Sequence, residues 1–287
     1  SAVADKVGKE FPRVRIKTLA YSYTQAAPEN MTAPDNVLVE ICGNFDGTDK
    51  SHANLVSAWS KVVKNISVYT YGGSNYGYWW PCPNLYEVGM QYPWAKEAGV
   101  TAFYVQGTAL GKGSGMVDLR AYLSARMAWD PSRDVKKEIR DFCNGFYGPA
   151  GKYIVEYLEW YPAYVKEHKM VMNAPQVWGD GEAWRKWVTK DAMDHADGLF
   201  QQALAAVKDK PIYMNHVRRA YLEVLWGGAM VNVNVGGSLM DKELVLVPGA
   251  DVAAVRARAK LFGEIMRENG YNMWSEPIGF DAATYPH

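Results

Sequence analysis

The first half of the chain repeats a pattern of strand, loop and helix, and this repeat restricts the fold more than any other feature of the sequence. Four segments combine β-branched and aromatic residues and are bounded by Gly, Pro or Asn, which predicts strands over residues 13–24, 36–47, 66–71 and 99–107. Apolar residues at helical spacing predict a helix over 52–65, and another is predicted near 85–99. Strands that alternate with helices pair in parallel, so we expect an α/β architecture for residues 1–118.

The pattern changes near Leu119, where strand-like segments give way to helical ones. Residues 119–168 have helical periodicity almost throughout, with breaks at Asp130-Pro131 and Gly148-Pro149, and most of the remaining sequence is similar. The sequence therefore predicts an α/β fold followed by an all-α one. The corresponding domains are 1–118, an α/β domain, and 119–287, a mostly α-helical region.

Composition and charge exclude several classes of protein. The formal net charge is zero, which gives no electrostatic basis for binding nucleic acid or an anionic membrane surface. No apolar run approaches the roughly 20 residues that span a bilayer, and the polar opening segment does not resemble a secretory leader. Three cysteines and five isolated histidines provide no zinc-type ligand spacing, so we expect neither a metal nor a cofactor. In GTALGKGSG, Gly113 follows Lys112, which departs from the spacing of a phosphate-binding loop.

The loops after the predicted strands differ from the loops before them. Those that follow the strands are long and rich in Gly, Pro, Asn and aromatic residues, whereas those that lead into the strands are short. The most aromatic is YTYGGSNYGYWWPCPNL, residues Tyr69 to Leu85. The chain has 19 Tyr and 11 Trp against 8 Phe, a preference for rings that are part apolar and part polar. Since parallel α/β folds bind ligands beyond the carboxyl ends of their strands, we expect the functional edge there.

Two carboxylates of the second strand region admit both a structural and a functional interpretation. Alternation places Val37, Val39 and Ile41 toward helices and leaves Glu40 on the opposite face. A buried carboxylate needs a partner, so Glu40 is either paired with a basic residue of the first strand, Arg15 or Lys17, or part of a site. Asp46, in GNFDG, is either a turn residue beside Gly47 or a substrate ligand.

Aromatic and amide side chains gather at the predicted strand ends. Each ring taken alone is expected to be a packing plug, and at least one of the two tryptophans is expected to pack its loop. Together, however, the rings are typical of a carbohydrate cleft, because sugars stack C–H faces on them and hydrogen-bond through hydroxyls. The predicted substrate-binding residues are Tyr21, Tyr23, Asp46, Tyr71, Trp79, Trp80 and Gln106, with Tyr69 beside Tyr71.

An ordered set of motifs resembles a known family. The motifs are LAYSYT, DNVLVEICGNF, YTYGGSNYGYWWPCPNL, AGVTAFYVQG, DLRAYLSARMAWDPSRDV and FYGPAGKYIVEYL, between Val3 and Tyr164. They are similar to bacterial barrel proteins of domain-of-unknown-function family 4838, which includes secreted endo-β-N-acetylglucosaminidases acting on N-glycans. The resemblance implies that the four strands are the C-terminal half, about four β/α units, of a TIM-type (β/α)8 barrel whose first half is absent from this chain.

The resemblance also implies an activity. It suggests a glycoside hydrolase of the endo-β-N-acetylglucosaminidase type, secreted, periplasmic or cell-surface in a bacterium, whose catalytic carboxylates lie outside this chain, so no catalytic residue is assigned. Tyr69-Thr70-Tyr71 and Gln106 depart from the family pattern, in which Trp-Asp-Tyr and Glu are frequent, which points to a different subsite preference. The alternatives are a non-catalytic carbohydrate-binding relative and a structural module with aromatic plugs. The expected partners are a glycan substrate and either the missing half or a second copy that covers the open sheet edge.

Overall fold

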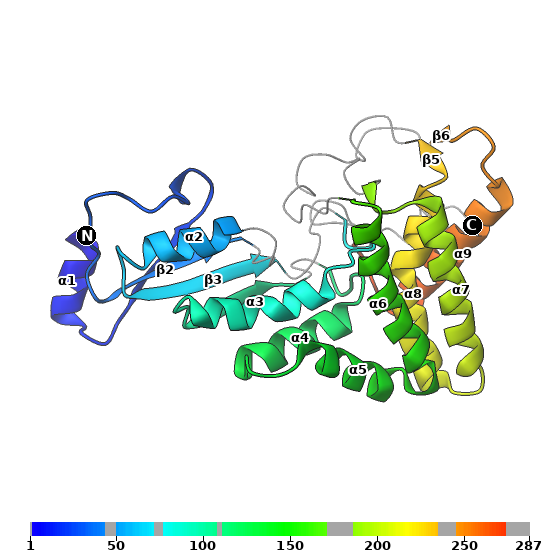
Figure 1. Ribbon diagram of the computed structural model, residues 1–287, viewed down its shortest axis with the longest axis horizontal. Coiled ribbons are helices and arrows are strands. Elements are labelled where there is room, and N and C mark those ends of the chain that lie inside the picture. The colour runs from blue at the N-terminus through cyan, green and yellow to red at the C-terminus, as the bar shows by residue number, and fades with distance from the viewer. Residues whose placement is uncertain are drawn as a thin grey trace. The chain divides into compact units, whose positions relative to one another are not determined.

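The computed structural model describes residues 2–43, 50–71, 77–107, 111–170, 186–234 and 245–273. Figure 1 shows the helices and strands along the chain. In chain order they are α1 (Ala2–Glu10), β1 (Ile16–Ala20), η1 (Ser22–Thr24), β2 (Val37–Cys42), α2 (Lys50–Trp59), β3 (Asn65–Tyr71), α3 (Leu85–Glu97), β4 (Ala102–Gln106), α4 (Val117–Trp129), α5 (Val135–Phe146), η2 (Gly148–Ala150), α6 (Gly151–Glu167), α7 (Lys190–Ala206), α8 (Pro211–Met230), β5 (Val233–Asn234), β6 (Val245–Leu246) and α9 (Val252–Glu268).

The chain divides into two compact units that interleave along the sequence. The first, here called the sheet unit, comprises residues 1–72, 86–106 and 123–135. The second, the helical unit, comprises 73–85, 107–122 and 136–287. The loops that follow β3 and β4 therefore belong to the helical unit, although the strands themselves belong to the sheet unit.

The sheet unit contains a four-stranded sheet in the order β1-β2-β3-β4, and all neighbouring strands are parallel. This confirms the α/β prediction for the first part of the chain. The predicted positions of the four strands are also confirmed, but β1, β2 and β4 are shorter than expected. β1 ends at Ala20, because the chain turns at Tyr21 into the short helix η1. β2 ends at Cys42, followed by Gly43 with φ 156°.

All three connections between the parallel strands pack on the same face of the sheet. Val37, Val39 and Ile41 of β2 form a buried core with Ile66 and Val68 of β3. Ala27 and Ala33 from the β1–β2 connection, Val56 and Trp59 of α2, and Ala95 of α3 pack into this core. The predicted helix-facing set of β2 is therefore confirmed, and the sheet is wound in one direction.

The opposite face of the sheet carries a mixture of polar, aromatic and leucine side chains. In register, Leu19, Glu40 and Ser67 form one row across the strands, and Cys42, Tyr69 and Tyr104 form the next. Leu19 is 49% exposed and Tyr104 is 50% exposed. Glu40, Ser67 and Cys42 of the central strands are buried on this face. Parallel sheets usually have both faces covered, so the exposure of this face at the edge strands β1 and β4 is the unusual feature of this unit.

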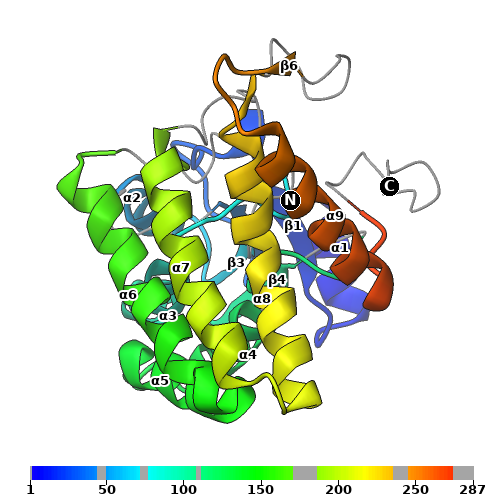
Figure 2. The same cartoon turned by 90° about the vertical axis from the view of Figure 1, so that its right-hand side faces the viewer.

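The helical unit is built on α6, α7, α8 and α9, which pack side by side in sequence order (Figures 1 and 2). Buried residues on α6 recur at helical spacing, for example Ile154, Tyr157, Tyr161 and Val165. Thr189 caps α7 and Asp251 caps α9, each by accepting a hydrogen bond from the backbone N–H three residues later. The predicted helical character of the later sequence is thus confirmed. Within the described residues, no helix is long and apolar enough to cross a membrane.

Candidate functional site

Five side chains at the carboxyl end of the sheet form a connected cluster on its exposed face, here called the tyrosine face. Parallel pairing puts Tyr69 of β3 beside Tyr104 of β4, and Tyr71 beside Gln106. Tyr21 follows directly after β1. The tyrosine face therefore consists of Tyr21, Tyr69, Tyr71, Tyr104 and Gln106, and three of the five (Tyr21, Tyr71 and Gln106) are substrate-binding residues predicted from the sequence.

Tyr69 lies at the centre of this cluster. Its ring stacks on that of Tyr104, with centroids 4.6 Å apart and planes inclined by 25°, and meets the Tyr71 ring edge-on at 5.5 Å. Its hydroxyl donates a hydrogen bond to the Gln106 side-chain carbonyl oxygen. Tyr69 thus supports an exposed ring on one side and orients an amide on the other.

Tyr21 and Tyr71 join the first strand to the third. Their side chains hydrogen-bond, and burial together with the neighbouring Tyr21 raises the pKa of Tyr71 above its usual value. The Tyr71 phenol therefore stays neutral at physiological pH, and both residues provide hydroxyl groups to a ligand. Tyr21 is 47% exposed, so a ligand has access to the cluster from this side.

Glu40 lies one row below the tyrosine face and has the structural partner that the sequence allowed. The Lys17 ammonium is 3.0 Å from Glu40 Oε2, and the Ser67 hydroxyl donates to Glu40 Oε1 at 3.3 Å. Glu40 is buried, whereas half of the Lys17 side chain is exposed. Burial and the Glu40 charge raise the pKa of the Cys42 thiol, which opposes a thiolate nucleophile at this position.

Trp79 and Trp80 are placed differently from the predicted rim. Both rings are buried in the helical unit, at 1% and 5% exposure. Trp79 packs against Phe262 and Tyr271 and donates from Nε1 to the Met273 carbonyl oxygen at 3.0 Å. Trp80 meets the Trp226 ring edge-on. At least one of the two tryptophans was expected from the sequence to pack its loop, and in this structure both do. Neither presents a face on which a sugar could stack.

The remaining predicted residues do not join the cluster. Tyr23, on η1, is 96% exposed. Asp46 lies outside the described residues, so both interpretations of it stay predictions.

Tyr104 was not among the residues predicted from the sequence, although its ring is the most exposed of the tyrosine face, at 50% against 47% for Tyr21. A signal was present: Tyr104 precedes Gln106 by two residues, and alternation along a strand puts both on one face. What the sequence does not give is the register that stacks Tyr104 on Tyr69, because register depends on how the strands align in the sheet.

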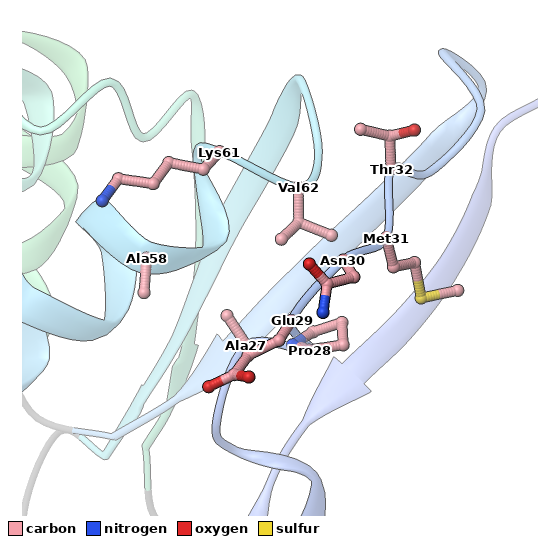
Figure 3. A pocket seen from close by; sticks show the side chains of 9 residues that line it. All are labelled: Ala27, Pro28, Glu29, Asn30, Met31, Thr32, Ala58, Lys61 and Val62. Atoms are coloured by element: carbon pink, nitrogen blue, oxygen red, sulfur yellow. The ribbon is translucent and has the colours of Figure 1, made fainter.

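An open groove lies elsewhere in the sheet unit, with a volume of about 730 Å³. Residues 27–32 of the β1–β2 connection form one wall, and Ala58, Lys61 and Val62 form the other (Figure 3). In Figure 3 the Lys61 side chain extends away from the Glu29 carboxylate, so the charged groups do not converge. The groove was not predicted, and we assign it no function. Among the described residues, no three His, Cys, Asp or Glu side chains gather as a metal site.

Comparison with known proteins places the chain in a family. No curated protein and no solved structure matches the chain. The family model described as "Domain of unknown function (DUF4838)" matches residues 1–159, which include the whole four-stranded sheet and the tyrosine face. The match covers more than half of the 287 residues and agrees with the resemblance carried by the sequence motifs. The chain therefore belongs to this family of domains of unknown function.

Proposed function

We propose that this protein is carbohydrate-active and that the tyrosine face binds a glycan. The observation that carries the proposal is the stacked pair of Tyr69 and Tyr104 beside the Gln106 amide. A half-exposed ring with a second ring behind it offers a flat apolar surface in a fixed orientation. The amide and the phenol hydroxyls around it supply hydrogen-bonding groups of the kind that sugar hydroxyls and acetamido groups recognise.

The reaction that we propose is hydrolysis of a glycosidic bond, of the endo-β-N-acetylglucosaminidase type on N-glycans, in a protein secreted or attached to the surface of a bacterium. This part rests on the family resemblance. Such enzymes need a pair of carboxylates near the scissile bond. Glu40 does not suit that role, because it is paired with Lys17 beneath the cluster. As the family resemblance implies, the proposed catalytic carboxylates come from strands outside this chain, and the tyrosine face forms substrate subsites.

The proposed architecture is half of a TIM-type (β/α)8 barrel. Two observations support it: the four parallel strands are in sequence order, and all three connections pack on one face. A doubly wound sheet would place connections on both faces. In the proposed barrel, four further β/α units complete the sheet, its two edge strands pair with the added strands, and the face opposite the helices becomes the barrel interior.

A calorimetric titration tests the proposed function. The wild-type chain should bind N-acetylglucosamine oligomers or an N-glycan, Tyr104→Ala should weaken binding at least tenfold, and Tyr104→Phe should retain most of it. Trp129→Ala is the matched control, since Trp129 is 90% exposed in the same unit but lies on α4. Absence of binding by the folded wild-type protein, or equal loss in the Trp129 control, would refute carbohydrate binding at the tyrosine face.

A second candidate function is an interaction module, and the distribution of exposed apolar side chains favours it. Phe11, Val14 and Leu19 are 57%, 46% and 49% exposed around the edge strand β1. Unpaired edges with apolar surroundings tend to be covered by another chain. A dimer in light scattering that Leu19→Lys converts to a monomer, with no glycan bound, would favour this candidate over the first.

A further inference from the structure

One buried arginine hydrogen-bonds to both of the loops that follow β3 and β4. Arg120, on α4, is 6% exposed. Its guanidinium donates to the Cys82 carbonyl oxygen at 2.9 Å and to the Asn84 side-chain oxygen at 2.8 Å, both in the loop after β3. Its Nε donates to the Gly115 carbonyl oxygen at 3.1 Å, in the loop after β4. The two loops also meet directly, because the Gly115 amide donates to the Tyr78 carbonyl oxygen at 2.7 Å.

A buried carboxyl group lies against the same point of the second loop. Glu223, on α8, is 2% exposed, and its Oε1 accepts a hydrogen bond from the Tyr157 hydroxyl at 2.8 Å. Its Oε2 accepts no hydrogen bond from the described part of the chain. That oxygen is so close to Gly115 that a Cβ at this position would lie 2.3 Å from it. An unpaired buried oxygen is costly in the ionised state and much less so in the protonated acid.

The groups around Glu223 leave Arg120 as its cation. Arg120 faces it from α4, Tyr157 and Tyr161 from α6, and Tyr147 from the turn before η2. Burial raises the pKa of each of these three tyrosines well above its usual value, so they stay neutral. On α8 itself, Arg219 is engaged by Asp118. Among these groups, the Glu223 carboxyl is the one whose pKa burial brings close to neutral pH.

We propose that Glu223 is a proton-controlled latch for these two loops. While the carboxyl is protonated, Arg120 holds Cys82, Asn84 and Gly115. When the proton leaves to solvent, the Oε2 anion beside Gly115 competes for the Arg120 guanidinium and draws it from the loop oxygens. The loops after β3 and β4 then lose three hydrogen bonds together. The latch lies wholly in the helical unit and is independent of what the tyrosine face binds.

The direction of titration agrees with this geometry. Burial raises the pKa of Glu223 to about 7, against smaller opposing effects of the Arg120 charge and the Tyr157 hydrogen bond. The protonated fraction of such a group falls about tenfold between pH 6 and pH 8. Loop protection that depends on the protonated form should fall by the same factor.

Hydrogen exchange measured by mass spectrometry tests the latch on the whole chain, with rates corrected for the intrinsic pH dependence. Peptides covering 77–85 and 111–120 should lose about tenfold protection from pH 6 to pH 8 in the wild type, and Glu223→Gln should remove this dependence. Glu138→Gln is the matched control, because Glu138 is also buried and accepts from the Tyr122 hydroxyl at 2.7 Å. That variant should keep the wild-type profile.

A second variant keeps the proposal testable if Glu223→Gln does not fold. The Tyr157 hydrogen bond lowers the pKa of Glu223, so Tyr157→Phe should move the midpoint of loop release to higher pH. A residue that served only as packing would not move a midpoint. Loop protection that does not change with pH in the wild type, or a midpoint that stays in place in Tyr157→Phe, would overturn the latch.

Discussion

The two units use the same kinds of residue in opposite ways. In the helical unit, the rings of Trp79, Tyr157 and Tyr161 are almost completely buried and hydrogen-bonded inside the unit. In the sheet unit, Tyr21 and Tyr104 are about half exposed and contact other tyrosines. Tyrosine and tryptophan suit both settings, because each combines an apolar body with a polar group. Local burial, rather than residue type, separates rings that hold the fold from rings that are available to a ligand.

The buried carboxyl groups differ in the same manner. Glu40 in the sheet unit is neutralised by the Lys17 ammonium and bonded by Ser67. Glu223 in the helical unit has a tyrosine partner for one oxygen and none within the described residues for the other. A paired carboxylate is a fixed part of a structure, whereas a buried acid without a contacting cation is held neutral and responds to pH.

The largest expected effect separates a structural ring from a ligand-binding ring. Trp79→Ala should lower the free energy of unfolding by about 3–5 kcal/mol, because it removes a fully buried ring packed on Phe262 and Tyr271. Tyr104→Ala should cost less than about 1 kcal/mol, since its ring is half exposed. Urea denaturation measures both values. If Trp79→Ala left stability intact and abolished glycan binding, Trp79 would be a ligand-binding residue. That result would contradict the distinction between buried structural rings and exposed ligand-binding rings.

The next effect is a pH dependence confined to the helical unit. The pKa of Glu223 is raised from 4.5 to about 7 on folding, so the folded state binds the proton more tightly than the unfolded state. The stabilisation is complete below pH 4.5 and is lost as pH rises through about 7, a total of about 3 kcal/mol. The melting temperature of the wild type, measured from pH 4.5 to above pH 7, should therefore decline relative to that of Glu223→Gln. If the melting temperatures of the two proteins changed with pH in parallel, Glu223 would not titrate in this range.

A pair of glycine substitutions measures how tightly the helical unit is packed. A Cβ on Gly151 would lie 2.6 Å from the Cys143 carbonyl oxygen, a backbone atom that cannot move aside, so Gly151→Ala should destabilise by about 1–3 kcal/mol. Gly145, on α5, has nothing within 4 Å of the same position. Gly145→Ala should therefore stabilise by about 0.5–1 kcal/mol through helix propensity. Thermal unfolding of the two variants should give shifts of opposite sign, and a shared sign would contradict the packing described for α5 and α6.

The smallest effect concerns the ion pair of the sheet unit. Lys17→Met should destabilise by about 1 kcal/mol, because the buried Glu40 loses its cation while half of the lysine side chain is already solvated. Adding Glu40→Gln should recover most of this loss. A double-mutant cycle in urea gives the coupling energy, and a coupling near zero would mean that Lys17 does not hold Glu40.

Much of the fold could be predicted from local pattern, and the site only in part. The alternation of Val37, Val39 and Ile41 identified the helix-facing side of β2, and the same alternation allowed Glu40 to pair with Lys17. Tyr104 was missed because its role depends on register with Tyr69, which is a property of two strands that are distant in sequence. Trp79 and Trp80 were placed at a rim because they follow a strand, but burial by Phe262, Tyr271 and Trp226 comes from the far end of the chain and leaves no local signal.

The most direct test of the central claim is fluorine NMR of the protein labelled with 3-fluorotyrosine, titrated with an N-acetylglucosamine oligomer. The 19 tyrosines report on both units at once, and Tyr→Phe variants assign the signals. We predict saturable shifts at Tyr21, Tyr69, Tyr71 and Tyr104. The signals of Tyr157, Tyr161 and Tyr221, which are buried in the helical unit, should not change. Shifts restricted to the helical unit, or a spectrum that does not change up to millimolar sugar, would contradict glycan binding by the tyrosine face.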